Sequence, residues 1–559
     1  MNISAINALN VVSKSTNFNR PNARIHNTFL KQDTVTFSSS ALQKEINVSP
    51  EKAEIVVNSL RTSTSGHRDK YMGENFTPEI VKLITLGVAD VAKDEARKNN
   101  SRPLVLIGGD TRRATRESLP LIQDTLQKQG VDVLSIKNPV PTPMLAVAAK
   151  DKNIDLSVLM TASHNPWEDG GYNFVTKTGA IAPAPVTEKI ADYVDQHAKT
   201  HKYTESAVKG NAIDFNPFPI YKSLMDNNFI DWDRIRDAKI DIYYDGLKGT
   251  GPYVVPELFK SYGIDFERVI SSGQTGPNPT GSNLSVLKKA IAASANKIKV
   301  GLSNDGDADR FGVIDEKGNF INPNDVMLLV GYHLAKNKGL RGAAIRSQAS
   351  SRQLDDLADV YGLKKFETPV GFKYIGEDIL NLRKNGEDIL VAGEESGGLT
   401  VAKHIPEKDG IMAISLILDL IAQEGKPLSE ILQNIKQKLG VSYSMSDFSK
   451  KLYDEAAKDV IMAKVEKKFN DMKNGKIGFG PIHFINVEKS LDTRRNMENY
   501  RPGGDGYKFV LTDGSSVLVR KSGTEPLVKC YIDAAGKNQQ YAKLVNDLLR
   551  SYMSDFFVI

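Results

Sequence analysis

Beyond residue 50, short apolar runs that are typical of buried strands alternate with segments of helical period. The run RPLVLIGGD (102–110) precedes RESLPLIQDTLQKQG, and IDIYYDG (240–246) precedes PYVVPELFKSYG. The same order recurs around KVGLSNDGD (299–307) and GAAIRSQ (342–348). Strands and helices that alternate in this way predict several α/β units in tandem.

The alternation changes near residue 440. After it, GFGPIHFINV (478–487), YKFVLTDGSSVLVRKSG (507–523) and KCYIDAAG (529–536) are typical of strands and turns flanked by helices, which predicts an α+β unit. A Pro-bearing break at 214–219 and the region near 330 supply two further boundaries. The predicted organisation is a disordered tail over 1–45, α/β domains over 46–215, 216–330 and 331–445, and an α+β domain over 446–559.

The predicted tail is rich in Ser, Asn and Thr, carries few acids and shows no period. This composition is typical of a disordered tail and also of an organelle transit segment. No stretch approaches the roughly 18 apolar residues of a membrane-spanning helix, and the start of the chain lacks an apolar signal core. We therefore expect a cytoplasmic protein without a membrane partner, with import through the N-terminal segment as the alternative.

The composition excludes some classes of partner. The 559 residues carry a net charge of only +5, and no sustained basic run is interleaved with aromatics, so we expect no nucleic-acid partner. The single cysteine, Cys530, cannot form an internal disulfide and does not indicate a cysteine-ligated metal. A monomer and a homodimer are both compatible with this chain.

Three aspartates alternate in SNDGDADRFGVID: Asp305, Asp307 and Asp309. In an extended segment they would project to one side, where crowded carboxylates are unfavourable unless a cation or protons compensate them. Hard oxygen ligands on a partly open loop suit Mg²⁺. An EF-hand is disfavoured because Arg310 stands at the sixth position, where that loop needs glycine. A solvated acidic turn without metal is the remaining alternative.

Two further loops carry polar groups that a core does not explain. Glu394, Glu395 and Ser396 stand between glycines after the apolar DILVA, where they could bind sugar hydroxyls or form a plain surface turn. In VLVRKSGTEPLVK, amides, hydroxyls and cations around a turn would form a phosphate nest, with a structural turn as the alternative. The residues of this nest are Arg520, Lys521, Ser522, Gly523, Thr524 and Lys529.

The stretch MTASHNPWEDGG (160–171) places Ser163 beside His164 and before an Asn-Pro turn. A Ser-His hydrolase is disfavoured because the G-x-S-x-G elbow is absent and a histidine seldom serves as base for the adjacent residue. A merely structural turn is the local alternative. A metal loop, a polyol-binding loop and a phosphate nest in the same chain favour phosphoryl transfer, with Ser163 as the phosphate carrier.

In this order, TASHNP, DGDADR, GEESGG and RKSGTEP resemble the motifs of the α-D-phosphohexomutase superfamily, in particular its phosphoglucomutase/phosphomannomutase members. The resemblance runs from about Thr64 to Lys529. It implies four domains around a central cleft, three related α/β domains and a smaller C-terminal α+β domain. It also implies a phosphoserine at Ser163 and Mg²⁺ held by the three aspartates with an oxygen of that phosphoserine. GEESGG would contact the sugar, and RKSGTEP would bind the phosphate that is not transferred.

Further matches extend the resemblance. TSGHR (64–68) is similar to the N-terminal active-site loop of the family, which implies that Arg68 lies near the transferred phosphate. TPVGFKYI (368–375) and HIPEKDG (404–410) are similar to two third-domain segments. The candidate catalytic residues are therefore Ser163, Arg68, His164, Lys373 and His404, and Arg310 joins Glu394, Ser396 and the phosphate nest as a substrate-binding residue.

Two positions depart from the family pattern. Asn173 stands where the family usually has a lysine, ten positions after the phosphoserine, and Gly398 stands where many members have histidine. The general acid/base must then be another group, and we favour Lys373 and His404 over Lys177, which follows Asn173 on the same face of an extended segment.

The expected activity is reversible phosphoryl transfer between hexose 1-phosphate and hexose 6-phosphate, through a hexose 1,6-bisphosphate intermediate. The residues EES in the sugar loop favour glucose or mannose phosphate over glucosamine phosphate. The alternative is a catalytically silent homologue that only binds sugar phosphates, for which Asn173 is the one supporting feature.

Overall fold

The computed structural model describes residues 43–557 apart from 63–65, 272–275, 453–454, 474–486, 493–505 and 523–526. The predicted tail therefore lies almost wholly outside the described residues. Its last three residues form β1 (Gln43–Glu45), which pairs antiparallel with β7 (Lys202–Thr204). The side chains of β1 are exposed, so backbone pairing holds this strand.

The first sheet contains six strands in the order β2-β6-β5-β3-β4-β8. Strands β5, β3, β4 and β8 are parallel, and β6 is antiparallel to β5 and to β2. The strands are β2 (His67–Lys70), β3 (Leu104–Gly109), β4 (Asp132–Ser135), β5 (Leu156–Met160), β6 (Asp169–Thr176) and β8 (Ala212–Asp214). The helices of this part are α1 (Pro50–Thr62), α2 (Pro78–Lys98), α3 (Arg113–Lys128), α4 (Thr142–Asp151) and α5 (Ala184–Thr200).

Both faces of the first sheet are covered. Val105 and Ile107 of β3 belong to the apolar cluster that includes α1, α2 and α5, whereas Leu106 belongs to the cluster that includes α4. This alternation is the period of two expected of a strand. Because both faces are buried, the strand appears in the sequence as a continuous apolar run.

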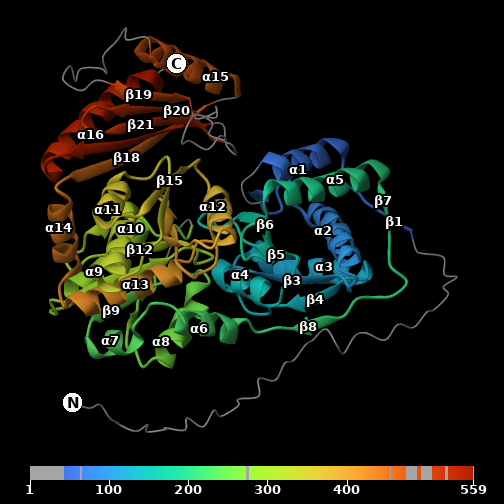
Figure 1. Ribbon diagram of the computed structural model, residues 1–559. Helices are drawn as coiled ribbons and strands as arrows, with labels where there is room; N and C mark the ends of the chain where they lie inside the picture. Colours follow the sequence, from blue (N-terminus) through green and yellow to red (C-terminus); the bar gives the residue numbers. More distant parts are fainter. Residues whose placement is uncertain are drawn as a thin grey trace, which may run out of the picture. The chain divides into compact units, whose positions relative to one another are not determined.

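The second sheet, whose strands β9 and β12 are labelled in Figure 1, has the order β10-β9-β11-β12-β13. β10, β9 and β11 are parallel, and β12 and β13 follow as antiparallel strands. The strands are β9 (Asp241–Asp245), β10 (Glu267–Arg268), β11 (Lys299–Asn304), β12 (Phe311–Ile314) and β13 (Phe320–Ile321). The helices are α6 (Phe218–Asp226), α7 (Trp232–Asp237), α8 (Val255–Ser261) and α9 (Ser285–Ala293), with short 3₁₀ turns at Gly251–Tyr253 and Gly281–Leu284.

The third sheet has the order β15-β14-β16-β17, in which only β17 is antiparallel to its neighbour. The strands are β14 (Ala343–Ser347), β15 (Lys364–Thr368), β16 (Ile389–Glu394) and β17 (Gly398–Val401). The helices are α10 (Pro323–Tyr332), which continues as a π-helix over His333–Asn337, α11 (Gln353–Tyr361), α12 (Phe372–Lys384), α13 (Gly410–Glu424) and α14 (Leu428–Leu439). Helix α13 is buried over most of its length. Its N-cap is Asp409, whose carboxylate accepts hydrogen bonds from the amide N–H groups of Ile411 and Met412.

The fourth sheet is antiparallel throughout, in the order β18-β22-β21-β20-β19. The strands are β18 (Ser442–Lys451), β19 (Val487–Asp492), β20 (Gly506–Leu511), β21 (Ser516–Lys521) and β22 (Leu527–Gly536). The helices are α15 (Glu455–Lys473) and α16 (Gln539–Ser554), followed by a 3₁₀ turn at Asp555–Phe557. Apolar residues of both helices pack with this sheet in a cluster of their own. The α+β character predicted for the last part of the chain is confirmed.

None of the helices within the described ranges combines the length and the apolar content that crossing a bilayer requires.

Candidate active site

The first three sheets place their polar loops at equivalent positions. In each sheet a parallel strand ends in a loop and the chain returns as an antiparallel strand, at β5–β6, β11–β12 and β16–β17. The β5–β6 loop carries Ser163, the β11–β12 loop carries Asp305, Asp307 and Asp309, and the β16–β17 turn follows Glu394. One strand arrangement thus presents three chemically different loops.

The serine loop and the aspartate loop are in direct contact. Ser163 Oγ donates a hydrogen bond to Asp305 Oδ2 at 2.9 Å, and both residues are buried. Ser163 has a φ of 51°, in the left-handed region that non-glycine residues seldom adopt. Gly306 makes the approach possible, because a Cβ at that position would lie 2.6 Å from the Ser163 carbonyl oxygen.

The three aspartates form a cluster that can hold a metal ion. One carboxylate oxygen from each residue lies within 4.8 Å of the other two. Burial, followed by the charge of Asp307, raises the pKa of Asp305 well above its usual value, and burial with the charge of Asp309 raises the pKa of Asp307 to about 6. One oxygen each of Asp307 and Asp309 is buried without a hydrogen-bond partner among the described residues. Unpaired, hard, crowded oxygens fit Mg²⁺.

Two arginines bring positive charge to the same place. The Nε atoms of Arg68 and Arg310 are buried and have no hydrogen-bond partner in the described part of the chain. Arg310 also contacts His164 through Nη1 and Nδ1. The charge of Arg310, then burial, then the charges of Arg68 and Lys529 hold the pKa of His164 well below its ordinary value. His164 is therefore neutral and accepts from Arg310.

A buried ion pair that the sequence analysis did not identify holds the serine loop from behind. Arg112 Nε pairs with Asp110 at 2.9 Å, and neither side chain is exposed. The remaining guanidinium nitrogens of Arg112 donate to the backbone carbonyls of Ser163, Asn165, Pro166 and Asp169. The signal in the sequence was GGDTRR (108–113), which overlaps the end of the first predicted strand.

The same aspartate also orders the residues just before the serine. Asp110 accepts from Thr161 Oγ1 at 2.8 Å, and Thr161 Oγ1 in turn accepts from the amide N–H of Ser163, also at 2.8 Å. Arg112 and Asp110 together can therefore hold Ser163 in its unusual backbone conformation.

The sugar loop lies against the aspartate loop. Arg310 and Gly398 form an isolated antiparallel bridge. Glu394 is buried and accepts the amide N–H of Gly371 at 2.8 Å. Burial, followed by the charge of Glu395, raises the pKa of Glu394 to about 7. Ser396 is exposed, so a hydroxyl is open to a ligand next to a carboxyl group that titrates near neutral pH.

Part of the predicted phosphate nest is described. Arg520 at the end of β21 and Lys529 on β22 face each other in the strand register. Ser522 is buried, and its amide N–H donates to Leu527 at 2.9 Å. The predictions for Gly523 and Thr524 lie outside the described residues.

The chain matches four domain families in order: phosphoglucomutase/phosphomannomutase alpha/beta/alpha domain I over residues 60–201, domain II over 221–318, domain III over 322–439 and the C-terminal domain over 454–551. These ranges cover most of the chain and contain all four loops described above. The chain belongs to the phosphoglucomutase/phosphomannomutase family. It is an enzyme of the phosphohexomutase class, and the predicted fold of three related α/β domains and a C-terminal α+β domain is confirmed.

Curated relatives align with 66% to 88% of the chain. A phosphoglucomutase/phosphomannomutase of Thermococcus kodakarensis is 28% identical over 486 residues, which is 85% of this chain and 95% of that protein. A phosphoglucomutase of Emericella nidulans is 26% identical over 542 residues, 88% of this chain and 93% of the relative. A phosphoglucosamine mutase of Solidesulfovibrio magneticus is 28% identical over 383 residues, 66% of this chain and 80% of its own length.

Solved structures share the fold. Parafusin, a phosphoglucomutase from Paramecium in its open form, aligns with a TM-score of 0.72 at 23% identity, covering 89% of this chain and 95% of its own. A chain from Thermus thermophilus described as a phosphomannomutase aligns with a TM-score of 0.70 at 23% identity, covering 88% of this chain and 99% of its own. Together with the aspartate cluster, membership of the phosphoglucomutase/phosphomannomutase family supports Mg²⁺ as the cofactor, as expected from the sequence.

Of the two third-domain candidates for proton transfer in this phosphohexomutase, only Lys373 is partly accessible. Lys373 lies in the first turn of α12, half-buried, and burial lowers its pKa. His404 is fully buried, with Nε2 at 2.8 Å from Asp409 and Nδ1 at 3.2 Å from Asn228. With both ring nitrogens engaged away from solvent, His404 is placed to support the start of α13 rather than to meet a substrate.

The structure identifies a different lysine beside the aspartate cluster. Lys408 Nζ lies 3.1 Å from Asp309 and 3.1 Å from Glu407. Burial opposes its charge, but Asp309 and Glu407 outweigh burial and raise the pKa of Lys408. In the sequence, Lys408 lies within HIPEKDG, and nothing in that segment shows which of its charged residues faces the aspartate loop.

The two residues near the missing family lysine have structural roles. Asn173 is buried and donates through Nδ2 to the Thr161 carbonyl at 2.7 Å, so it supports the serine loop. Lys177 is 45% exposed and pairs with Asp155. The ammonium group of Lys177 is therefore engaged in a surface ion pair.

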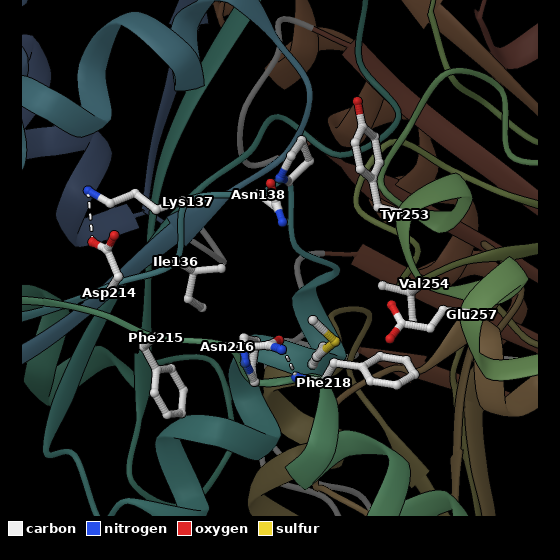
Figure 2. Close-up of a pocket in the computed structure, with 13 residues that line it drawn as sticks. Ile136, Lys137, Asn138, Asp214, Phe215, Asn216, Phe218, Tyr253, Val254 and Glu257 are labelled. Carbon is white, nitrogen blue, oxygen red and sulfur yellow. Dashed lines mark hydrogen bonds and ion pairs between the residues drawn. The ribbon is translucent and has the colours of Figure 1, made fainter. Parts of the chain in front are cut away.

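A pocket of about 340 Å³ lies where the chain passes from the first sheet to the second (Figure 2). Lys137 and Asp214, joined by an ion pair, stand on one side, and Tyr253 and Glu257 stand on the other. The described residues that line it include neither Ser163 nor the three clustered aspartates, Asp305, Asp307 and Asp309. This pocket is distinct from the phosphohexomutase site.

Proposed function

We propose that this chain interconverts hexose 1-phosphate and hexose 6-phosphate, of glucose or mannose, through a hexose 1,6-bisphosphate intermediate and a phosphorylated Ser163. Membership of the phosphoglucomutase/phosphomannomutase family supports the reaction class. The assignment of roles to individual residues rests on the geometry of the cluster around Ser163.

One observation carries this proposal. Around the Ser163 hydroxyl, buried groups of both signs have no hydrogen-bond partner among the described residues: oxygens of Asp307 and Asp309, and the Nε atoms of Arg68 and Arg310. A buried polar atom without a partner is unfavourable, so such atoms at one place indicate a ligand. A phosphoryl group on Ser163 would accept from the guanidinium groups, and a divalent cation would bind the carboxylates.

In the proposed first step, the bond between phosphorus and Ser163 Oγ breaks while phosphorus bonds to the free hydroxyl oxygen of the sugar. The hydroxyl proton passes to Lys373, and the departing Ser163 Oγ takes up a proton to regain its hydroxyl. The bisphosphate then reorients in the site, and its other phosphoryl group is transferred to Ser163 Oγ. Arg68 and Arg310 hold the phosphoryl oxygens, and this electrostatic support is the main catalytic term in phosphoryl transfer. Mg²⁺ at the three aspartates would neutralise charge on the transferred group.

The two third-domain lysines have different proposed roles. Lys373, whose pKa is lowered by burial, suits a group that takes up and returns the hydroxyl proton. Lys408, whose pKa is raised by its carboxylate partners, stays charged and serves as a fixed cation beside Asp309. His404 does not take part in this scheme.

The rest of the substrate is bound by two loops. Glu394 and Ser396 bind sugar hydroxyls, and the phosphate nest binds the phosphate that is not transferred. The nest residues assigned to this phosphate are Arg520, Ser522, Gly523, Thr524 and Lys529. Lys521, the remaining nest residue, pairs with Asp459.

The test is a coupled assay of the purified chain with Mg²⁺, in which glucose 1-phosphate is converted to glucose 6-phosphate, with mannose 1-phosphate in parallel. We expect Ser163→Ala to lose about 10³-fold or more in kcat. The exposed Ser223→Ala on α6 is the control. Hexose 1,6-bisphosphate labelled in its phosphates should label the wild type and not Ser163→Ala. If the wild-type chain bound hexose phosphate but neither converted it nor became labelled, it would instead be a catalytically silent homologue.

A second arm tests the metal site. Asp307→Asn removes one of the three carboxylates and should raise the Mg²⁺ concentration needed for half-maximal activity while lowering kcat. Full activity of the native enzyme after chelation would contradict the proposed metal site.

A further inference from the structure

The 347–352 loop, which begins at the last residue of β14, contacts the fourth sheet through a buried carboxylate. Asp533 on β22 accepts hydrogen bonds from Ser351 Oγ at 2.9 Å and from the amide N–H of Arg352 at 2.8 Å. Asp533 is 4% exposed. Hydrogen bonds to a buried charge are strong and geometrically demanding, so this carboxylate fixes the loop relative to β22.

Two further contacts hold the same loop to the fourth sheet. Lys508 of β20 is buried and donates from Nζ to the Gln348 carbonyl oxygen at 3.1 Å. Ala349 packs against Leu518 and Tyr531 in a small apolar cluster. Most residues of the loop therefore make contacts that depend on how the fourth sheet packs against it.

The other side of the loop holds the sugar loop. Ser347 Oγ donates to Glu395 Oε2 at 2.8 Å, and Ser350 Oγ lies 3.3 Å from the same oxygen. The amide N–H of Glu395 donates back to Ser350 Oγ at 3.0 Å. Glu395 is thus held by both its side chain and its backbone, directly between Glu394 and Ser396.

We propose that the 347–352 loop couples phosphate binding at the fourth sheet to sugar binding at the sugar loop. Glu395 is the positioning residue: when the fourth sheet packs against the 347–352 loop, Glu395 holds the sugar loop in place. This inference rests on the proposed function, because that function assigns the phosphate nest to the fourth sheet and the sugar contacts to Glu394 and Ser396. Glu395 itself faces the serines of the loop and acts through the turn that it anchors.

The coupling has a thermodynamic consequence. A ligand that stabilises the packing of the fourth sheet on the 347–352 loop also orders the turn at Glu395. In return, a ligand that orders this turn stabilises the packing of the fourth sheet on the loop. A hexose phosphate that engages both elements therefore binds more tightly than the separate contacts would allow. A fourth-sheet substitution should loosen the sugar loop even though no substituted atom touches it.

The first arm measures amide hydrogen exchange in the full-length chain without substrate. Asp533→Asn leaves one acceptor oxygen where the carboxylate offers two, so Ser351 Oγ and the Arg352 N–H can no longer both donate to this side chain as they do now. We expect exchange in peptides covering 394–398 to quicken by roughly tenfold. The control is Asp513→Asn, an exposed carboxylate in the β20–β21 turn that bonds to Ser515. Ser351→Ala is the milder variant and should act in the same direction. Unchanged exchange at 394–398 in both variants would overturn the inference.

The second arm uses kinetics. Glu395→Gln and Asp533→Asn should each raise KM for hexose 1-phosphate by about tenfold, the effect of one lost buried hydrogen bond, with a smaller change in kcat. The double variant should be no worse than the more affected single variant, because both changes interrupt one path. Fully additive effects would contradict the coupling. A wild-type chain without turnover would disprove the proposed function, and the exchange arm would still decide the coupling.

Discussion

The side chain of Lys408 occupies the space that any side chain at position 398 would need. A Cβ at Gly398 would lie 2.2 Å from Lys408 Cδ and 2.7 Å from Cγ. The Nζ atom of the same lysine lies 3.1 Å from Oδ2 of Asp309, in the aspartate cluster. The glycine at the end of the sugar loop and the lysine beside the aspartates are therefore a matched pair, and the absence of a histidine at 398 is what allows Lys408 to enter.

We expect Lys408→Met to lower kcat by about 10²-fold with a smaller effect on KM, because it removes a fixed charge from the place where phosphoryl charge develops. Lys177→Met is the matched control, since Lys177 is exposed and pairs with Asp155. Initial rates with hexose 1-phosphate measure the effect. A loss in the control together with normal activity of Lys408→Met would instead assign the cationic role to position 177.

Gly398→Ala should displace Lys408 and lower kcat by roughly tenfold, because the added methyl group overlaps the Cγ and Cδ atoms of the lysine. In the Lys408→Met background the same substitution should have a much smaller effect, since the two changes act on one contact. Comparing kcat for the single and double variants measures this. Equal effects in both backgrounds would mean that Gly398 is required for another reason.

Acidification should weaken substrate use through Glu394. Burial and the charge of Glu395 raise the pKa of this group to about 7, so the carboxylate is the main form above that pH and the neutral acid is the main form below it. We expect kcat/KM to fall as the pH drops below about 7, approaching tenfold per pH unit. In Glu394→Gln, kcat/KM should be lower than in the wild type above pH 7, and this fall with decreasing pH should be absent. The ionisation of the substrate phosphate, with a pKa near 6, should remain in the variant as an internal control.

Arg112→Lys should slow the phosphorylation of Ser163, because lysine cannot replace a guanidinium that donates to four carbonyls and pairs with Asp110. A loss of ten- to a hundredfold in the labelling rate by hexose 1,6-bisphosphate is expected, from about 1–3 kcal/mol of lost buried hydrogen bonding. Arg113→Lys is the control, because that neighbouring side chain is exposed and pairs with Glu117. Equal effects at both positions would show that Arg112 does not hold the serine loop.

Removal of residues 1–42 should leave kcat and the thermal transition nearly unchanged, since the apolar content of this segment is too low to join a core. Removal of 1–45 also deletes β1 and its pairing with β7, and should cost slightly more. Thermal melts of both truncations, with rates alongside, test this. A transition lowered by many degrees after the shorter truncation would show that the segment packs on the rest of the chain.

The sequence by itself determined the fold class and the chemistry of the loops. Parallel strands covered on both faces appear as unbroken apolar runs, and glycine-rich polar segments directly after them cannot join a core. For this reason Ser163, the three aspartates and the Glu394 loop could be found by local pattern, and their order along the chain indicated the family.

Only the tertiary structure decided which distant side chains meet. Arg112 reaches the carbonyl of Ser163, Lys408 reaches Asp309, and His404 turns to Asp409 and Asn228. Each of the first two contacts joins loops that follow different strands, and local spacing does not report which face of a loop a neighbouring strand will bring close. The link from Asp533 through the 347–352 loop to Glu395 depends on the same physics, because hydrogen bonds shielded from water exist only once both sheets have packed against the loop.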